Sequence, residues 1–192
     1  MPELPTTSRG AATSRRILDA AAREFSERGI AGARIDRITA AAHTNKAQLY
    51  GYFGSKDGLF DAAMEDCLAR GASDVPFDAN DLPGWAVSLY DANLRHPVAV
   101  RLMAWARLER HPAGLVLPGL DLGPKLKSVT EAQQAGRVRP GDPSDLLTMV
   151  AGMASAWSPA SAAYAATAED PAADHARRRA LLRDCVQCAV AP

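Results

Sequence analysis

Apolar residues recur along most of this chain at intervals of three and four positions, the spacing that puts side chains on one face of an α-helix. The first such run is Ile17–Phe25, with Thr13 or Ser14 suited to cap the helix and Gly29 suited to end it. No segment alternates apolar and polar residues convincingly, as a half-buried strand does. The pattern therefore predicts an all-α fold of about nine helices.

Two short helices follow the first one, separated by a short break. They are predicted at Ala33–Ala42 and Lys46–Phe53, and the break is His43–Asn45, in which Asn45 is a good N-cap. Ser55 then begins a longer helix that runs to about Gly71. Helix, short helix, turn and short helix is the order of a helix-turn-helix, which presents its last helix to the major groove of DNA.

The remainder of the chain keeps the helical spacing. Further helices are predicted at Leu82–Arg95, Val98–Arg110, Lys125–Ala135, Pro143 to about Trp157 and Ala172–Val190. Residues 111–124 are predicted to be a loop punctuated by Gly and Pro, and residues 1–11 a flexible tail. The stretch 146–168 has no charged residue, but its Ala, Ser and Thr content suits a helix packed between helices rather than a membrane span.

The balance of charge changes along the chain. Its 192 residues hold 22 Lys+Arg and 22 Asp+Glu, and 47% are hydrophobic, which excludes wholesale disorder and a uniformly basic nucleic-acid coat. Residues 1–56 nevertheless hold 9 Lys+Arg against 5 Asp+Glu, a charge of +4, and residues 57–192 hold 13 against 17, a charge of −4. This asymmetry is a hint of a polyanionic partner for the N-terminal part.

The predicted helix Lys46–Phe53 carries residue types that contact DNA. Leu49 and Phe53 anchor it to the core, which leaves most of its other side chains outside. Lys46 and Gln48 suit guanine and adenine edges, respectively. The alternative is that these polar residues form an ordinary solvated helix face. Further side chains that can reach phosphates are Tyr50, Tyr52 and Lys56.

Two segments carry a family resemblance. Residues 17–25 (ILDAAAREF) and residues 49–60 (LYGYFGSKDGLF) resemble the N-terminal domain of TetR-family transcriptional regulators. The resemblance covers about residues 12–72 and implies a DNA-binding domain there, with its helix-turn-helix at about residues 34–53. DNA contacts are expected at Arg34, Thr44, Asn45, Lys46, Ala47, Gln48, Tyr50, Tyr52 and Lys56.

Four positions depart from the family pattern. Arg34 stands where the family commonly has a small hydroxyl residue near a phosphate. His43 replaces the turn glycine at a position that often needs a positive φ, and Thr44 replaces the usual valine. Gly51 lies inside the recognition helix, where it costs about 1 kcal/mol relative to alanine. The last three departures leave an alternative open, a helical small-molecule-binding or scaffolding protein whose helix-turn-helix has lost specific DNA binding.

The resemblance implies that residues 73–192 form a helical domain that binds an effector and pairs two chains into a homodimer. Adaptable or aromatic residues that can line the effector site, or else form plain core, are Trp85, Leu89, Met103, Trp105, Met149, Met153 and Trp157. Residues expected in the dimer interface of the last two helices are Ala151, Ala154, Ser155, Leu181, Cys185 and Cys188.

The function predicted from these observations is sequence-specific DNA binding, by a repressor that a small apolar or aromatic effector releases from a roughly palindromic operator. No catalytic constellation or metal-ligand spacing is present, so no enzyme activity, cofactor or metal is expected. The absent apolar signal region and the three cysteines indicate a reducing, cytoplasmic location. Cys185 and Cys188 are interpreted as small apolar residues on one helix face, with a redox or metal role as the alternative.

Overall fold

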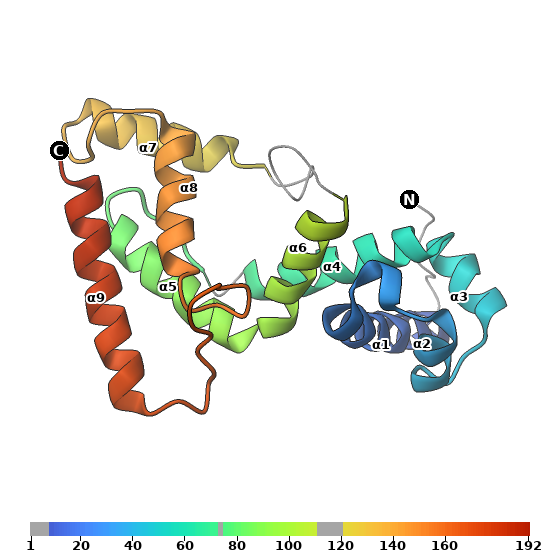
Figure 1. Cartoon of the computed structure of the whole chain (residues 1–192). Coiled ribbons are helices and arrows are strands. Elements are labelled where there is room, and N and C mark those ends of the chain that lie inside the picture. Colours follow the sequence, from blue (N-terminus) through green and yellow to red (C-terminus); the bar gives the residue numbers. More distant parts are fainter. Residues whose placement is uncertain (1–7, 73–74, 111–120) are drawn as a thin grey trace. The chain divides into compact units, whose positions relative to one another are not determined.

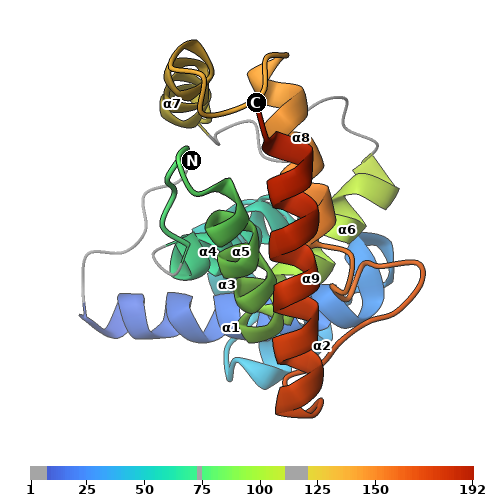
Figure 2. The ribbon, with the colours of Figure 1, turned by 90° about the vertical axis from the view of Figure 1, so that its left-hand side faces the viewer.

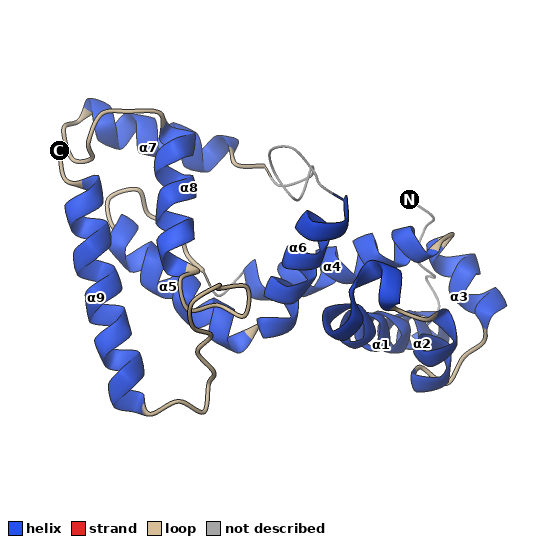
Figure 3. Ribbon diagram, in the orientation of Figure 1, coloured by secondary structure: helices blue, strands red, loops and turns tan. Residues whose placement is uncertain are grey.

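The computed structural model describes residues 8–72, 75–110 and 121–192 (Figure 1). Within these ranges every regular element is a helix, as Figure 3 shows, and the predicted all-α fold is confirmed. None of the described helices is long and apolar enough to cross a membrane. The helices are α1 (Ser8–Gly32), α2 (Ile35–Ala41), α3 (Lys46–Phe53), α4 (Lys56–Ala72), α5 (Leu82–Arg95), α6 (Pro97–Arg110), α7 (Gly123–Gln134), α8 (Pro143–Ala154) and α9 (Ala172–Val190).

Helix α1 begins earlier than the sequence predicts. It starts at Ser8, inside the predicted tail, whereas residues 1–7 lie outside the described part of the chain. Alanine has the highest helix propensity, so Ala11 and Ala12 extend the helix backwards at little cost. The two predicted capping residues are consequently buried within the helix instead of lying at its start.

Several other helix ends differ from the prediction. Helix α2 spans Ile35–Ala41 instead of Ala33–Ala42, and α6 begins at Pro97, one residue early. Helix α7 begins at Gly123, because Pro124 fits the first turn of a helix, where no backbone N–H has an acceptor in the helix. Helix α8 ends at Ala154, shortly before the turn that leads to Pro159. The bounds of α3, α5 and α9 are those predicted. Most of the predicted loop, residues 111–120, lies outside the described residues.

The helices form two compact units. The first contains α1, α2, α3, most of α4 and nearly all of α6, and the second contains α5, α7, α8 and α9. In the first unit, the fully buried rings of Phe25 and Phe60 meet edge to face with centroids 5.2 Å apart, which joins α1 to α4. Ile38 and Leu49 bring α2 and α3 into the same buried set. Arg110 pairs with carboxylates of α4 and lies 4.7 Å from the centroid of Phe60.

The sequence assigns α6 to the C-terminal domain, but the structure packs it with the N-terminal unit. The indole N–H of Trp105 donates to the carbonyl of Ser26 at 3.2 Å. The carboxylate of Glu109 accepts from the backbone N–H groups of Ile30 at 3.1 Å and Ala31 at 2.7 Å. These contacts join residues far apart in sequence, so no local pattern predicts them.

The backbone conformation of Gly29 explains why N–H groups near the end of α1 bond to Glu109. Its φ of 72° and ψ of −179° kink α1 in a backbone region that is essentially restricted to glycine. The kink starts a new helical turn, whose first N–H groups have no acceptor within the helix. Glu109 supplies that acceptor, and so the predicted helix end at Gly29 is a kink followed by one further turn.

The second unit is built around the contact between α5 and α9, which run side by side (Figure 2). Its core contains Trp85, Tyr90, Leu147 and Val186. Tyr90 is 2% exposed, and its hydroxyl forms a hydrogen bond of 2.7 Å with Nδ1 of His175, which is also buried. This bond gives the Tyr90 hydroxyl and Nδ1 of His175 a partner and joins the two helices, whereas Nε2 of His175 is buried with no hydrogen-bond partner among the described residues.

We expect Gly51→Ala to stabilise the first unit by about 0.5–1 kcal/mol, because alanine has less backbone freedom to lose on folding. Gly51 is exposed inside α3, and a methyl group there would meet no atom within 4 Å. Thermal unfolding at a fixed protein concentration measures the effect. Gly54→Ala is the matched control, because the φ of Gly54 is +72° in an equally open place; a rise in melting temperature for both variants, or for neither, would contradict this account.

Candidate nucleic-acid interface

The turn between α2 and α3 adopts the geometry that the sequence predicts. His43 has a φ of 50°, as expected for the residue that replaces the turn glycine. The backbone N–H of Thr44 donates to the carbonyl of Thr39 at 3.0 Å. Asn45 is extended, and its side-chain oxygen accepts from the N–H of Gln48 at 2.9 Å, which confirms the predicted N-cap. The turn is therefore held by backbone and cap hydrogen bonds despite its unusual sequence.

Helix α3 is attached to the first unit through one face only. Leu49 is 0% and Phe53 is 6% exposed, as predicted for the two anchors. Tyr50 is 41% exposed. The other side chains of α3 that lie exposed are Lys46, Ala47 and Gln48, and Tyr52 is half-buried. The polar face of the predicted recognition helix is thus available to a partner.

Lys46 of α3 forms an ion pair with a residue of α2. Its ammonium lies 2.8 Å from the carboxylate of Asp36 in α2, and both side chains are more than half exposed. The hydrogen bond to Asp36 raises the pKa of Lys46, so the side chain is charged at neutral pH. Asp36 was not predicted to belong to this region, because the contact depends on how α2 and α3 cross.

A chain of hydrogen bonds runs along the exposed face of α3. The hydroxyl of Thr44 donates to Oε1 of Gln48 at 2.6 Å, and Nε2 of Gln48 donates to the hydroxyl of Tyr52 at 3.3 Å. The residues are four positions apart, so they lie on one side of the helix. The spacing is visible in the sequence, but the bonding is a feature that the structure adds.

The remaining predicted DNA contacts lie at the borders of α2 and α4. The side chain of Arg34 is exposed, and its backbone N–H donates to Glu24 at 3.0 Å. Lys56 is half-buried, and its ammonium donates to the carbonyl of Ala31 at 3.2 Å. Lys56 therefore holds the end of α1 and has two further N–H groups for a phosphate.

Comparison with known proteins identifies this arrangement. Residues 17–63 match the sequence family described as bacterial regulatory proteins, tetR family, and residues 81–187 match the tetracyclin repressor-like C-terminal domain. The HTH-type transcriptional repressor SCO4008 of Streptomyces coelicolor is 38% identical over 147 residues, which are 74% of this chain and 77% of that repressor. The chain belongs to the TetR family. It is a transcriptional regulator whose N-terminal unit carries the DNA-binding helix-turn-helix.

Solved structures share the fold of this TetR-family regulator. The transcriptional regulator SCO4942 of Streptomyces coelicolor superimposes with a TM-score of 0.77 at 36% identity, over 93% of this chain and 98% of that one. AibR, solved in complex with isovaleryl coenzyme A and operator DNA, superimposes with a TM-score of 0.67 at 20% identity, over 91% of this chain and 97% of that one. The latter likeness concerns the fold alone.

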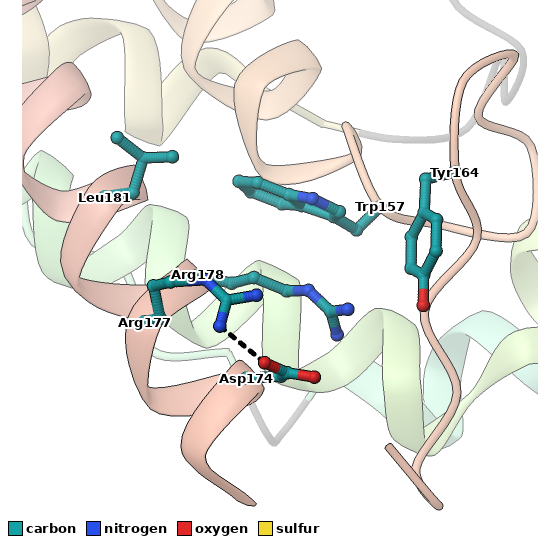
Figure 4. Close-up of a pocket in the computed structure, with 6 residues that line it drawn as sticks. All are labelled: Trp157, Tyr164, Asp174, Arg177, Arg178 and Leu181. Atoms are coloured by element: carbon teal, nitrogen blue, oxygen red, sulfur yellow. Dashed lines mark hydrogen bonds and ion pairs between the residues drawn. The ribbon is translucent and has the colours of Figure 1, made fainter. Parts of the chain in front are cut away.

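The second unit of this TetR-family chain contains a cavity of about 400 Å³ (Figure 4). Arg178 is buried beside it, bonds Asp170 at 2.7 Å and lies 5.1 Å from the ring centroid of Tyr164. The hydrogen bond to Asp170 raises the pKa of Arg178, which therefore stays charged. The residues that line the cavity are Trp157, Tyr164, Asp174, Arg177, Arg178 and Leu181.

The structure distributes the seven predicted effector residues between the two units. Met103 and Trp105 lie on α6 in the first unit. Met149 is 38% exposed on α8. Trp157 lines the cavity, and it is the one predicted residue that does so. The other three, Trp85, Leu89 and Met153, belong to or pack against the core of the second unit. Sequence reasoning missed the cavity's other residues because they come from separate segments.

The predicted interface residues of α8 and α9 differ in exposure. Ala154 is 1% exposed and packs in the core of its own chain, which removes its side chain from the predicted interface. Leu181 is 52% exposed, and the two cysteines of α9 are exposed as well, although they were interpreted as apolar residues. Ser155 is exposed and Ala151 is half-buried against the core.

Proposed function

We propose that this TetR-family regulator binds a roughly palindromic operator as a homodimer, with α3 of each chain in the major groove. The observation that carries the proposal is the exposed polar face of α3, held by two buried anchors and a capped turn. Two recognition helices about one helical turn of DNA apart read two half-sites, and so the operator mirrors the symmetry of the dimer.

The exposed face of α9 supports the pairing of two chains. Its buried side, which includes Leu182 and Val186, contacts its own unit, whereas the two cysteines are exposed and Leu181, at the edge of the cavity, is 52% exposed. A two-fold axis beside this face would bring it against the same face of a second chain. Analytical ultracentrifugation of the full chain tests the pairing, and a monomer at micromolar concentration would contradict it.

A gel-shift titration against DNA that flanks the chain's own gene tests the proposed function. We expect a discrete complex with one fragment, and an affinity that falls steeply with added salt as phosphate counterions are released. A scrambled fragment of the same length is the control. Equal affinity for both fragments would instead favour the helical binding or scaffolding protein without specific DNA recognition.

We also propose that the cavity of the second unit receives the effector and that the effector is a flat, apolar molecule with a carboxylate. Trp157, Tyr164 and Leu181 provide apolar walls, and Arg177 and Arg178 provide guanidinium groups. Each arginine forms an ion pair with an aspartate, Arg177 with Asp174 at 2.5 Å and Arg178 with Asp170 at 2.7 Å. Each guanidinium retains further N–H donors. A ligand carboxylate can use those donors or replace the aspartate.

Titration calorimetry with naphthalene-2-carboxylate and its neutral carboxamide tests the effector class. We expect the carboxylate to bind at least about tenfold more tightly, because charge-assisted hydrogen bonds to arginine are stronger than neutral ones. The double variant Arg178→Gln with Asp170→Asn removes both members of the ion pair and is expected to reduce the difference severalfold, because only Arg177 remains to bind the carboxylate. Equal binding of the two compounds, or none, would contradict the assignment.

A further inference from the structure

We propose that Thr44 and Tyr52 act as positioning residues for Gln48 and restrict it to reading adenine in the operator. The inference rests on the proposed function, because it concerns the same face of α3. It starts from the hydrogen bonds of the Gln48 amide, to Thr44 at 2.6 Å and to Tyr52 at 3.3 Å.

The amide of Gln48 has four hydrogen-bonding positions, two N–H donors and two lone pairs on its oxygen. Thr44 occupies one lone pair, and Tyr52 occupies one N–H. A hydroxyl can donate or accept, so a reversed amide between the same two hydroxyls would also use one position of each kind. In either orientation one donor and one acceptor remain for a partner.

Only one base presents, on its major-groove edge, the pair of groups that matches the remaining donor and acceptor of the Gln48 amide. Adenine presents an acceptor, N7, next to a donor, the N6 amino group, and so accepts from and donates to the same amide. Guanine presents two acceptors, for which Gln48 would have to give up its bond to Tyr52. Thymine presents a single acceptor and cytosine a single donor, which leaves part of the amide without a partner once water is excluded.

Both residues that hold Gln48 are themselves held in place. Thr44 lies in the turn, where its backbone N–H bonds Thr39 at 3.0 Å. The ring of Tyr52 is half-buried and meets the ring of the anchor Phe53 edge to face, with centroids 6.1 Å apart. The N–H of Gln48 is bonded to the cap Asn45 at 2.9 Å. The position of the Gln48 amide is therefore fixed in the free protein, because both its backbone and the two hydroxyls that bond it are held in place.

Direct phosphate contact is the competing role for Thr44 and Tyr52, and the two roles predict different measurements. A phosphate contact adds the same affinity to every sequence, because phosphates carry no sequence information. A positioning residue changes the ratio of affinities at one base pair. The ratio of dissociation constants for operators that differ at a single position therefore distinguishes the two roles.

The experiment selects operators from a randomised library with the full-length chain and then measures competition at each position for the unaltered chain and four variants. Gln48→Ala identifies the base pair that Gln48 reads. We expect adenine there, preferred over guanine by about tenfold, and a preference reduced severalfold by Thr44→Val and by Tyr52→Phe. Tyr50→Phe, which removes a hydroxyl outside the network, is expected to leave that ratio unchanged while it weakens binding to all sequences.

Other results overturn the inference. A base other than adenine at the Gln48 position does so, and so does a preference that Thr44→Val and Tyr52→Phe leave intact. Both substitutions keep the shape of the side chain, and melting curves verify that each variant folds. If the unaltered chain selects no sequence at all, the proposed function itself fails, and that outcome is distinct from specific binding without the expected preference.

Discussion

Replacing Lys46 and Tyr50 together by alanine is expected to weaken operator binding by at least about 100-fold, because each chain of the proposed dimer loses two DNA contacts. Removing Lys46 also leaves the carboxylate of Asp36 unpaired on the face that approaches the phosphates, since the two lie 2.8 Å apart. The repulsion between that carboxylate and DNA adds to the lost attraction. Gel-shift titration at fixed salt measures the change.

The control variant removes the charge of a lysine that lies in the other compact unit. Lys127 lies on α7, its side chain is 80% exposed, and its ammonium is 4.0 Å from Glu131. Lys127→Ala is expected to leave operator affinity nearly unchanged, because α7 belongs to the other compact unit. If the double variant bound the operator as tightly as Lys127→Ala, α3 would not be the DNA-contacting helix.

Gly29→Ala is expected to destabilise the first unit by about 3–5 kcal/mol, since two penalties combine at this position. The backbone of Gly29, with φ 72° and ψ −179°, is one that side-chain-bearing residues rarely adopt. An added methyl group would also overlap Oε1 of Glu109 and lie 2.9 Å from the indole of Trp105. Relief of that overlap would break the bonds from Glu109 to Ile30 and Ala31.

Urea unfolding at a fixed protein concentration, monitored by circular dichroism and by tryptophan fluorescence, measures this effect. Gly136→Ala is the matched control, because Gly136 has a φ of +66° but no atom within 4 Å of the added methyl group. The free energy of unfolding of Gly136→Ala is expected to fall by only about 1 kcal/mol, the cost of the backbone conformation alone. Equal losses for the two variants would show that the contacts of Glu109 and Trp105 contribute nothing at Gly29.

The local signals of the helix-turn-helix were sufficient to predict α3 at its observed bounds. Asn45 satisfies an N–H group of the first turn, and the four-residue spacing of Leu49 and Phe53 defines the buried face. These determinants lie within a few residues of one another, so they act in any protein that contains the segment. The positive φ of His43 was expected from the resemblance to the family, which has a glycine at this position.

The candidate site was less accessible to sequence reasoning. The ion pair of Asp36 with Lys46 depends on the crossing of α2 and α3, which no local pattern specifies. The positions 44, 48 and 52 share one side of α3, but their hydrogen bonds depend on the conformation of each side chain. The cavity of the second unit joins residues from the segment after α8 with residues of α9, and so its composition is decided by packing.

The sequence by itself determined the all-α class, the helical boundaries near strong capping and breaking residues, the recognition helix and its resemblance to TetR regulators. Only the tertiary structure decided that α6 packs with α1 through Trp105 and Glu109 and with α4 through Arg110, and that Ala154 is covered by its own chain. Helical periodicity identifies an apolar face because it depends on neighbours three and four positions away. It does not identify what covers that face, because the covering residues come from distant parts of the chain.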